Sequence, residues 1–421
     1  MMSVEKKNVL ILSTISGFLC KFERENVRLL QEYGYYVHYA ANMNEPHYLF
    51  DPAELSEMKV TTHHVEIARS PWLFRMNRGA YKRIKEIVRS HNIQMIHCHT
   101  AVGGLLGRLL RINFRNRIKI IYTTHGFHFH EGAPLQRRIV YQWTEKILAR
   151  FTDALITINQ EDYETAGGFK LRRGGRYYQI PGVGLNLEEF QPCSDEEREK
   201  SRAADNISKE VFHLATVGEL NANKNHTVVL EALMRMKKEN SKLAEKIRYS
   251  IWGDGFLRES LVEEIRHRGL EDVVVMKGYS RNVRNSLCGV DAFVFPSRRE
   301  GLGMVALEAL AMGIPVLASD NRGTREYMED KKNGYICYEN EPQEYIEGII
   351  WLNDLSTNER LQMGVQCRYS AYLFCQCRTK KEMHTIYGNT SEIERKLEKE
   401  ICVCDEVLDW NVSFDGVPTA R

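Results

Sequence analysis

Short runs of β-branched and aliphatic residues alternate along the chain with stretches in which apolar residues recur every three or four positions. The short runs predict buried strands, and the longer periodic stretches predict amphipathic helices. In the first half the predicted strands are 8–13, 36–41, 93–99, 118–125 and 153–159, and the predicted helices are 21–33, 77–90, 101–111 and 135–150. This alternation is typical of a parallel sheet that helices cover on both faces.

The alternation pauses at residues 180–192, a turn-rich stretch with glycines and prolines. A second series then supplies predicted strands at 211–218, 248–253, 273–278, 291–297 and 314–319, and helical patterns at 342–352 and 356–387. We therefore predict an α/β fold of two Rossmann-like, doubly wound parallel-sheet domains, residues 1–188 and 189–370. Such sheets bind ligands at the carboxyl ends of their strands, so we expect the active site in a cleft between the domains.

Composition excludes several classes of protein. Across 421 residues, 58 Lys and Arg stand against 56 Asp and Glu, which argues against a nucleic-acid partner. The charge is uneven, because residues 1–185 carry 26 basic and 16 acidic side chains and the remainder carries 32 and 40. The early apolar run 9–20 is interrupted and shorter than the roughly 20 residues that span a bilayer, so we expect no transmembrane helix. The ten cysteines lack zinc-ribbon spacing and predict reduced thiols.

The densest chemical signal lies in residues 295–328, which predict a strand, a loop, a helix and a second strand. Glu300 stands in the loop, and the helix begins at Gly303, Met304 and Val305. Free backbone N–H groups and the positive end of a helix dipole together form an anion site. Glu308 is placed to accept hydrogen bonds from a ribose diol. The alternative is that Glu308 only complements the helix dipole and Glu300 is a solvated loop residue.

These residues resemble those of a known family, the retaining nucleotide-sugar glycosyltransferases of family 4, whose two-domain fold is called GT-B. The resemblance covers about residues 5–388, and it implies that a helix near 371–388 belongs with the first domain. Residues 389–421 then form a tail to which we assign no chemistry. By resemblance, Glu300 contacts the hydroxyls of the donor sugar, Glu308 contacts the nucleotide ribose, and the helix start at Gly303 binds the diphosphate.

Further stretches similar to the family occur in order at 216–233, 252–261 and 277–283. The resemblance implies that Lys224 neutralises the leaving diphosphate, whereas a lone surface lysine is ordinarily only solvated. Many members carry Arg where this chain has Glu219, whose carboxylate cannot bind phosphate. Either Glu219 points away, or the missing charge comes from another residue such as Arg322, Arg298 or Arg281.

Two more residues are candidates for donor binding. Gly253 lies in a short G-x-G stretch after a predicted strand, which fits equally well a simple turn into the next helix. Tyr279 lies in the region that corresponds to the base-binding loop of the family. Its ring is expected either to stack on the base or to be a buried structural tyrosine.

The N-terminal half contributes histidines and a glycine. His97 and His99 share one face of a predicted strand, but no third ligand follows at a fitting distance. We expect neither a metal nor a cofactor, as the resemblance also implies. His125 ends a strand and resembles the histidine beside the donor sugar and leaving phosphate. Gly17 resembles the glycine of the loop near the donor phosphates, although an ordinary strand-to-helix connection explains it as well.

Basic residues concentrate in two segments of the first domain. Residues 69–89 carry seven basic and one acidic side chain with interleaved aromatic residues, and residues 108–119 add five basic side chains. This composition predicts a face that binds an anionic membrane, although solvated helix faces explain either segment alone. We therefore expect a lipid-linked or other saccharide acceptor, and a cytoplasmic protein at the inner face of the plasma membrane.

The predicted activity is that of a retaining hexosyltransferase. It moves a sugar from a nucleotide diphosphate, with UDP favoured, to a glycan or polyprenyl-diphosphate-linked saccharide in cell-surface polysaccharide biosynthesis. Two alternatives stay open. A nucleotide-sugar epimerase can share the GT-B fold and requires no acceptor. A non-catalytic nucleotide-sugar-binding partner is the other, and Glu219 favours it slightly.

Overall fold

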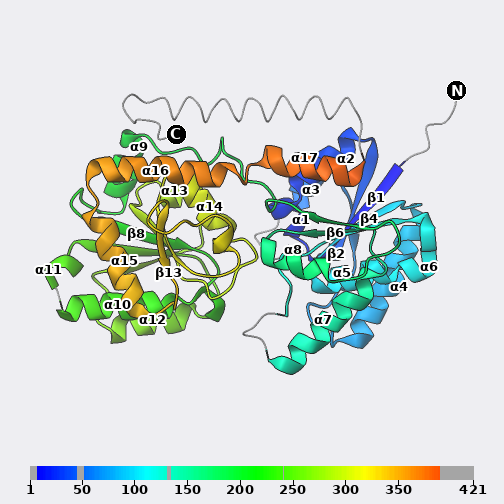
Figure 1. Cartoon of the computed structure of the whole chain (residues 1–421), viewed down its shortest axis with the longest axis horizontal. Coiled ribbons are helices and arrows are strands. Elements are labelled where there is room, and N and C mark those ends of the chain that lie inside the picture. The colour runs from blue at the N-terminus through cyan, green and yellow to red at the C-terminus, as the bar shows by residue number, and fades with distance from the viewer. Residues whose placement is uncertain (1–6, 45–51, 130–133, 240, 389–421) are drawn as a thin grey trace. The chain divides into compact units, whose positions relative to one another are not determined.

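The computed structural model describes residues 7–44, 52–129, 134–239 and 241–388 (Figure 1). The predicted tail at 389–421 lies outside these residues. Within these residues the chain divides into unit 1, which spans residues 7–183 and 377–388, and unit 2, which spans residues 184–376. The sequence-based boundaries at 188/189 and 370/371 thus lie a few residues from the divisions of the structure.

Unit 1 contains a seven-stranded parallel sheet in the order β3-β2-β1-β4-β5-β6-β7. Its strands are β1 (Lys7–Ile15), β2 (Tyr35–Asn42), β3 (Thr61–His64), β4 (Met95–His99), β5 (Lys119–Thr123), β6 (Ala154–Thr157) and β7 (Arg176–Gln179). Its α-helices are α1 (Phe18–Phe22), α2 (Arg24–Glu32), α3 (Pro52–Glu57), α4 (Phe74–Ser90), α5 (Ala101–Leu109), α6 (Arg111–Phe114), α7 (Leu135–Ala149), α8 (Gln160–Gly167) and, from the end of the described chain, α17 (Gln376–Tyr387). The inner strands β4 and β6 are fully buried and β5 is buried after its first residue, as expected of a sheet covered on both faces.

Unit 2 contains a six-stranded parallel sheet in the order β10-β9-β8-β11-β12-β13. Its strands are β8 (Phe212–Val217), β9 (Ile247–Trp252), β10 (Val274–Gly278), β11 (Ala292–Phe295), β12 (Val316–Ser319) and β13 (Gly334–Cys337). Its α-helices are α9 (Asp195–Ala204), α10 (His226–Glu239), α11 (Ser241–Ala244), α12 (Arg258–His267), α13 (Val283–Leu287), α14 (Met304–Ala311), α15 (Pro342–Asp354) and α16 (Thr357–Tyr372). Both sheets reverse their strand order beside the first strand, so the prediction of two Rossmann-like domains is confirmed.

The strands that the sequence pattern missed lie at sheet edges. β3, β7 and β13 are three of the four edge strands of the two sheets, and each has only four residues. An edge strand is paired on one side only and is less buried, so it does not need the continuous apolar run by which inner strands are recognised.

Two of the predicted helices are each divided into two in the structure. The segment 21–33 forms α1 and α2, which meet at the buried residue Glu23. The segment 356–387 forms α16 and α17. At that break Leu185 N–H donates to the Phe374 carbonyl, and Gln376 N–H donates to the Leu185 carbonyl. These contacts depend on a distant strand-like residue, so local periodicity does not reveal them.

One expectation about the cysteines is wrong. Cys193 and Cys288 form a disulfide within unit 2, with 5.7 Å between their Cα atoms. Four other cysteines are free and buried: Cys20, Cys98, Cys337 and Cys367. The prediction of reduced thiols rested on spacing along the chain. It could not account for two residues that are 95 positions apart and meet only in the fold.

Candidate active site

Two loops of unit 2 are joined by hydrogen bonds and thereby place the lysine of the first beside the glutamate of the second. In the first loop, the Asn221 side chain accepts from the N–H groups of Asn223 and Lys224. The second loop follows β11. Its Arg298 N–H donates to the Asn223 carbonyl at 2.8 Å, and the Asn223 amide donates to the Arg299 carbonyl at 2.8 Å.

Lys224 and Glu300 form an ion pair, with 2.6 Å between Nζ and Oε1. The two side chains are 19% and 15% exposed, so the pair is partly desolvated but open to a ligand. The Lys224 ammonium also lies 5.0 Å from the centre of the Phe295 ring. The sequence placed these two residues in separate motifs, and the structure brings them together. A cation beside a hydrogen-bond acceptor can bind a phosphate and a sugar hydroxyl at adjacent positions.

α14 begins directly after this pair. Gly303 precedes it with a φ of +86°, and a Cβ there would lie 2.8 Å from two ring carbons of Phe295. The helix is buried except along one edge, where Met304, Val305 and Glu308 are half-buried. The accessible amides at the helix start and the Glu308 carboxylate therefore share one edge. The positive end of the helix and these N–H groups attract an anion.

The positive charge around Glu300 comes from arginines that the sequence only partly identified. Glu219 is exposed. Arg322 is buried, and its Nε donates to the Glu300 carbonyl at 3.2 Å. Burial and the Arg322 guanidinium lower the pKa of Arg299, and the Glu300 carboxylate opposes that shift.

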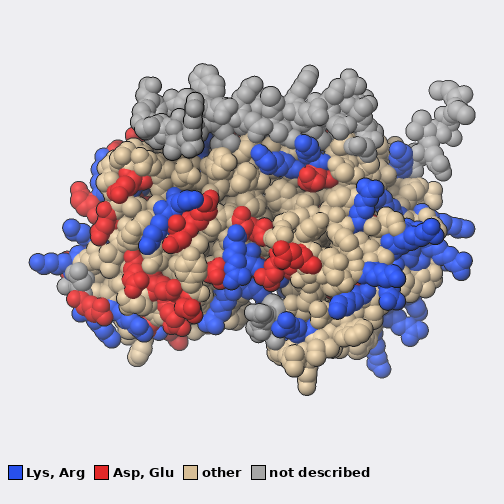
Figure 2. Space-filling view, in the orientation of Figure 1, with Lys and Arg blue, Asp and Glu red and all other residues tan. Residues whose placement is uncertain are grey.

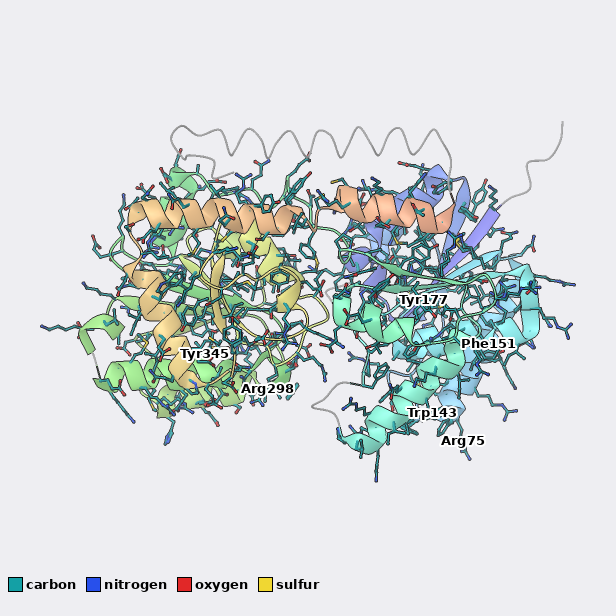
Figure 3. The ribbon with its side chains drawn as sticks, viewed as in Figure 1. Arg75, Trp143, Phe151, Tyr177, Arg298 and Tyr345 are labelled. Atoms are coloured by element: carbon teal, nitrogen blue, oxygen red, sulfur yellow. A yellow bond between two sulfur atoms is a disulfide. The ribbon has the colours of Figure 1, made fainter. Side chains whose placement is uncertain are left out.

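Two other arginines were considered for the same role. Arg298 donates to the Asn225 side chain at 3.0 Å and thus helps to hold the lysine loop (Figure 3). Arg281 is exposed in the loop after β10. Sequence reasoning did not single out Arg299, because it is one of two adjacent arginines in a loop and only the fold shows its proximity to Arg322.

Sequence reasoning also missed Tyr327. Its hydroxyl is buried, has no hydrogen-bond partner among the described residues, and lies 3.0 Å from where a Cβ on Gly303 would be. Burial and the charge of Glu300 raise its pKa well above the usual value. Tyr327 therefore packs beneath Gly303 at the start of α14 as a buried side chain. No motif in the sequence marks it.

For the two remaining donor-binding candidates of unit 2, Gly253 and Tyr279, the structure decides between the alternatives. Gly253 has a φ of +152°, and a Cβ there would lie 1.8 Å from the Gly218 carbonyl oxygen, so glycine is required for the close packing of two turns. Tyr279 is 52% exposed, which excludes the buried structural alternative. Its ring is available to a ligand.

In unit 1, His125 follows β5 and lies in a cluster of imidazoles and aromatic rings. Its Nε2 is 3.3 Å from His99 Nδ1, and the Phe18 ring meets it edge-on with centroids 5.2 Å apart. Burial lowers the pKa of His125 to about 4, so the ring is neutral at pH 7. Gly17 is buried and precedes α1 with a φ of −73°, a conformation open to any residue.

Glu23, which the sequence did not mark, continues this cluster. Its Oε1 is 3.5 Å from His99 Nδ1, and the Asn26 amide donates to its Oε2 at 2.7 Å. Burial raises the pKa of Glu23 to about 8 and lowers that of His99 well below its usual value. The carboxyl group is therefore largely protonated at neutral pH. Glu23 and His125 thus both approach Nδ1 of the buried His99, and these contacts orient the half-buried His125 ring.

His97 also belongs to this cluster, but both of its ring nitrogens already have hydrogen-bond partners. It shares a strand face with His99, as predicted, with ring centroids 4.1 Å apart. Its Nδ1 is 2.8 Å from the Tyr387 hydroxyl and its Nε2 is 2.8 Å from the Thr123 hydroxyl. Burial lowers its pKa to about 3. Because both ring nitrogens have partners, His97 anchors α17 to the sheet.

The basic surface of unit 1 differs from its prediction in one segment. Residues 69–89 expose six of their seven basic side chains beside Trp72, Leu73 and Phe74. In residues 108–119, by contrast, Arg108 and Arg111 are buried and pair with Glu145 and Asp153. Figure 2 shows Lys and Arg gathered over the part of unit 1 that carries α4 to α6.

α7 adds an apolar stripe that sequence reasoning missed. Four residues spaced four apart on its surface are exposed: Leu135, Ile139, Trp143 and Ile147. Figure 3 labels Trp143 on α7 and Arg75 on α4 toward the same end of unit 1. The four-residue spacing of this stripe is visible in the sequence of the helix predicted at 135–150. None of the helices formed by the described residues is long and apolar enough to cross a bilayer.

The chain belongs to the family 4 glycosyltransferases of the GT-B fold. Residues 24–174 match the family described as Glycosyltransferase Family 4, and residues 197–368 match the family described as Glycosyl transferases group 1. The chain is 32% identical over 396 residues to EpsD of Bacillus subtilis (strain 168), a protein provisionally named a glycosyltransferase, covering 94% of this chain and 100% of EpsD. The protein is therefore an enzyme of the hexosyltransferase type.

Two further relatives bear on the fold and on the substrates. The chain is 25% identical over 270 residues to the UDP-Gal:alpha-D-GlcNAc-diphosphoundecaprenol alpha-1,3-galactosyltransferase of Escherichia coli, covering 64% of this chain and 68% of that enzyme. The crystal structure of Anabaena Alr3699/HepE in complex with UDP and glucose has a TM-score of 0.72 and 16% identity, and covers 90% of this chain and 99% of that one. At this identity the second likeness shows the fold alone.

Proposed function

We propose that the protein transfers a sugar from a UDP-sugar to a saccharide on a polyprenyl diphosphate, with retention of configuration, in cell-surface polysaccharide biosynthesis. The observation that carries the proposal is the Lys224–Glu300 pair at the start of α14. It offers one cation, one carboxylate and free helix amides within one surface of unit 2. A sugar joined to a diphosphate requires this combination. The relative whose name contains a diphosphoundecaprenol substrate supports the acceptor class.

In the proposed reaction the acceptor hydroxyl attacks from the face that the diphosphate leaves, and a phosphate oxygen takes the hydroxyl proton. The bond from the sugar to the phosphate breaks as the new glycosidic bond forms, so no enzyme nucleophile is required. Lys224 and the amides of Met304 and Val305 stabilise the negative charge that develops on the phosphate. Glu300 accepts hydrogen bonds from sugar hydroxyls, and Glu308 accepts them from the ribose.

His125 has a different part in this proposal. A histidine with a pKa of about 4 carries no charge at pH 7, so it supplies a hydrogen bond to the donor sugar and no positive charge. The contact with His99, which Glu23 also approaches, orients its ring. Gly17 then belongs to the neighbouring loop, and Gly253 and Tyr279 belong to the nucleotide side.

The activity is tested by incubating the purified protein with UDP-, GDP- and ADP-sugars, with and without a lipid-linked saccharide extract, and measuring release of nucleotide diphosphate. We expect release that depends on the acceptor. Conversion of the free donor into its epimer would favour an epimerase. Nucleotide binding with no turnover on any acceptor fraction would favour a non-catalytic partner.

A matched pair of variants tests the site itself. Lys277 forms an ion pair with Asp205 at 2.6 Å, with side chains 20% and 23% exposed, so it closely resembles the Lys224 pair in distance and burial. We expect Lys224→Ala to lower the rate of transfer by roughly 10²–10³ and Lys277→Ala to preserve it. Equal losses in both variants would mean that the effect arises from a broken ion pair rather than from a lost contact to the diphosphate.

We further propose that unit 1 binds an anionic membrane through α4 and α7. Exposed tryptophan, leucine and isoleucine side chains flanked by arginines and lysines are suited to the boundary of an anionic bilayer. Sedimentation with anionic vesicles tests this. We expect Trp143→Ser to weaken binding and Phe256→Ser, which removes a 75% exposed ring from unit 2, to leave it unchanged. High salt should weaken the binding, and failure to bind at any salt concentration would refute it.

A further inference from the structure

Three histidines converge at one side of the sheet of unit 1, away from the residues described above. His38 is buried in β2, His63 lies on β3, and His91 follows the last residue of α4. We propose that His38, His63 and His91 bind one divalent transition-metal ion of the zinc type. The ion would have a structural role and would take no part in sugar transfer.

The topology of unit 1 brings the three rings together. His38 pairs in register with Thr61 and Ala40 pairs with His63, so both histidines point to the same face of the sheet. α4 covers that face through Ile84, Ile87 and Val88 and ends beside the two strands. His91, directly after the helix, completes the group.

The distances fit a metal with little rearrangement. One ring nitrogen of each histidine lies within 4.8 Å of the others, and His38 Nδ1 is 3.0 Å from His63 Nε2. Two nitrogens bound to a tetrahedral zinc at about 2.05 Å stand about 3.3 Å apart. The rings are already stacked or tilted against one another, with centroids 4.7, 4.9 and 5.3 Å apart. Small rotations of the half-buried His63 and His91 would close the site, and a water molecule would be the fourth ligand.

One nearby charge opposes a bound cation. The Arg83 guanidinium interacts electrostatically with the His63 ring and would repel an added metal ion. A bound metal must overcome that repulsion through three nitrogen bonds.

A neighbouring group also supports one orientation of His38. Its Nε2 is 3.4 Å from the Asn8 side-chain oxygen, while its Nδ1 faces His63. A proton on Nε2 would donate to Asn8 and leave Nδ1 to the metal. Hydrogen bonds of this kind orient histidine ligands in metal sites.

The cluster is separate from the candidate active site. Asn8 is near the amino end of β1, whereas His99 and His125 lie at or just after the carboxyl ends of β4 and β5. Glu23, His97 and His99 also lie within ligand distance of one another, but both ring nitrogens of His97 already have hydroxyl partners. The metal is therefore assigned to the three-histidine cluster of β2, β3 and α4.

The experiment uses the full chain, stripped with chelator and titrated with Zn²⁺ by calorimetry and with Co²⁺ by absorption spectroscopy. We expect one ion per chain, a cobalt spectrum of nitrogen ligands without a thiolate charge-transfer band, and a zinc-dependent rise in the unfolding temperature. His63→Ala and His91→Ala should each weaken binding at least ten-fold. His267→Ala, which removes an exposed histidine from unit 2, should not.

Three results would overturn the proposal. The first is the absence of zinc binding to the folded wild-type chain, verified by circular dichroism. The second is wild-type affinity in both His63→Ala and His91→Ala. The third is a strong thiolate band with cobalt, which would place the ion on cysteines. None of these readouts depends on sugar transfer, so the experiment tests the metal site independently of the proposed function.

Discussion

Replacing Gly303 by alanine tests whether the start of α14 binds the diphosphate. The residue has a φ of +86°, where an L-residue is strained by about 1–2 kcal/mol. The added Cβ would lie 2.8 Å from Phe295 ring carbons and 3.0 Å from the Tyr327 hydroxyl, and such overpacking costs about 1–3 kcal/mol. We expect unit 2 to lose about 2–5 kcal/mol of unfolding free energy, which for a domain of this size lowers the melting temperature by about 2–4 °C per kcal/mol.

Gly313→Ala is the matched control at the other end of α14. Its φ is +75°, but the nearest atom to an added Cβ is 3.6 Å away, an ordinary contact. We expect only the strain of about 1–2 kcal/mol there. Comparison of the two variants by urea unfolding therefore isolates the overpacking against Phe295 and Tyr327.

The functional readout is UDP affinity, measured by calorimetry on both folded variants. A hydrogen bond to a charged group contributes roughly 1.5–3 kcal/mol, so displacing one helix amide from the phosphate should weaken binding at least about ten-fold. Gly313→Ala should bind UDP as the wild type does. If Gly303→Ala also retained wild-type affinity for UDP, the diphosphate would not lie at this helix start. If Gly303→Ala and Gly313→Ala lost the same unfolding free energy, the packing argument would be contradicted.

Three further predictions concern other parts of the molecule. Lys224→Ala should lower the rate of sugar transfer by roughly 10²–10³, measured at saturating donor, because it removes one charge-stabilising group; a change in KM alone would contradict this. Glu23→Gln should become more stable than the wild type as pH rises from about 4.5 to about 8. In that window the raised pKa of Glu23 means that the wild-type chain takes up a proton when it folds, so its stability falls with rising pH. Unfolding midpoints of the two proteins that differ equally at all pH values would disprove this. Arg108→Met should cost about 3–5 kcal/mol by leaving Glu145 buried without its bidentate partner, and Arg108→Met with Glu145→Leu should recover most of it in urea unfolding.

The sequence alone determined the architecture, because parallel inner strands buried on both faces must be continuous apolar runs. All ten strands expected from such runs are present, namely the nine inner strands and the edge strand β10. The same pattern could not reveal β3, β7 and β13, whose single pairing removes the requirement for apolar residues. It also marked Glu300 and the helix start, because a loop glutamate followed by glycines at a helix terminus is a local arrangement.

Only the tertiary structure decided which distant residues meet. The pairing of Lys224 with Glu300 depends on hydrogen bonds between two loops that lie far apart in the sequence of unit 2. Burial, which no local pattern measures, makes Glu23 a protonated acid beside His99 and turns Arg108 from a predicted surface charge into an internal one. The convergence of His38, His63 and His91 likewise follows from strand register and the end of a helix, because side chains far apart in sequence become neighbours only when the sheet has formed.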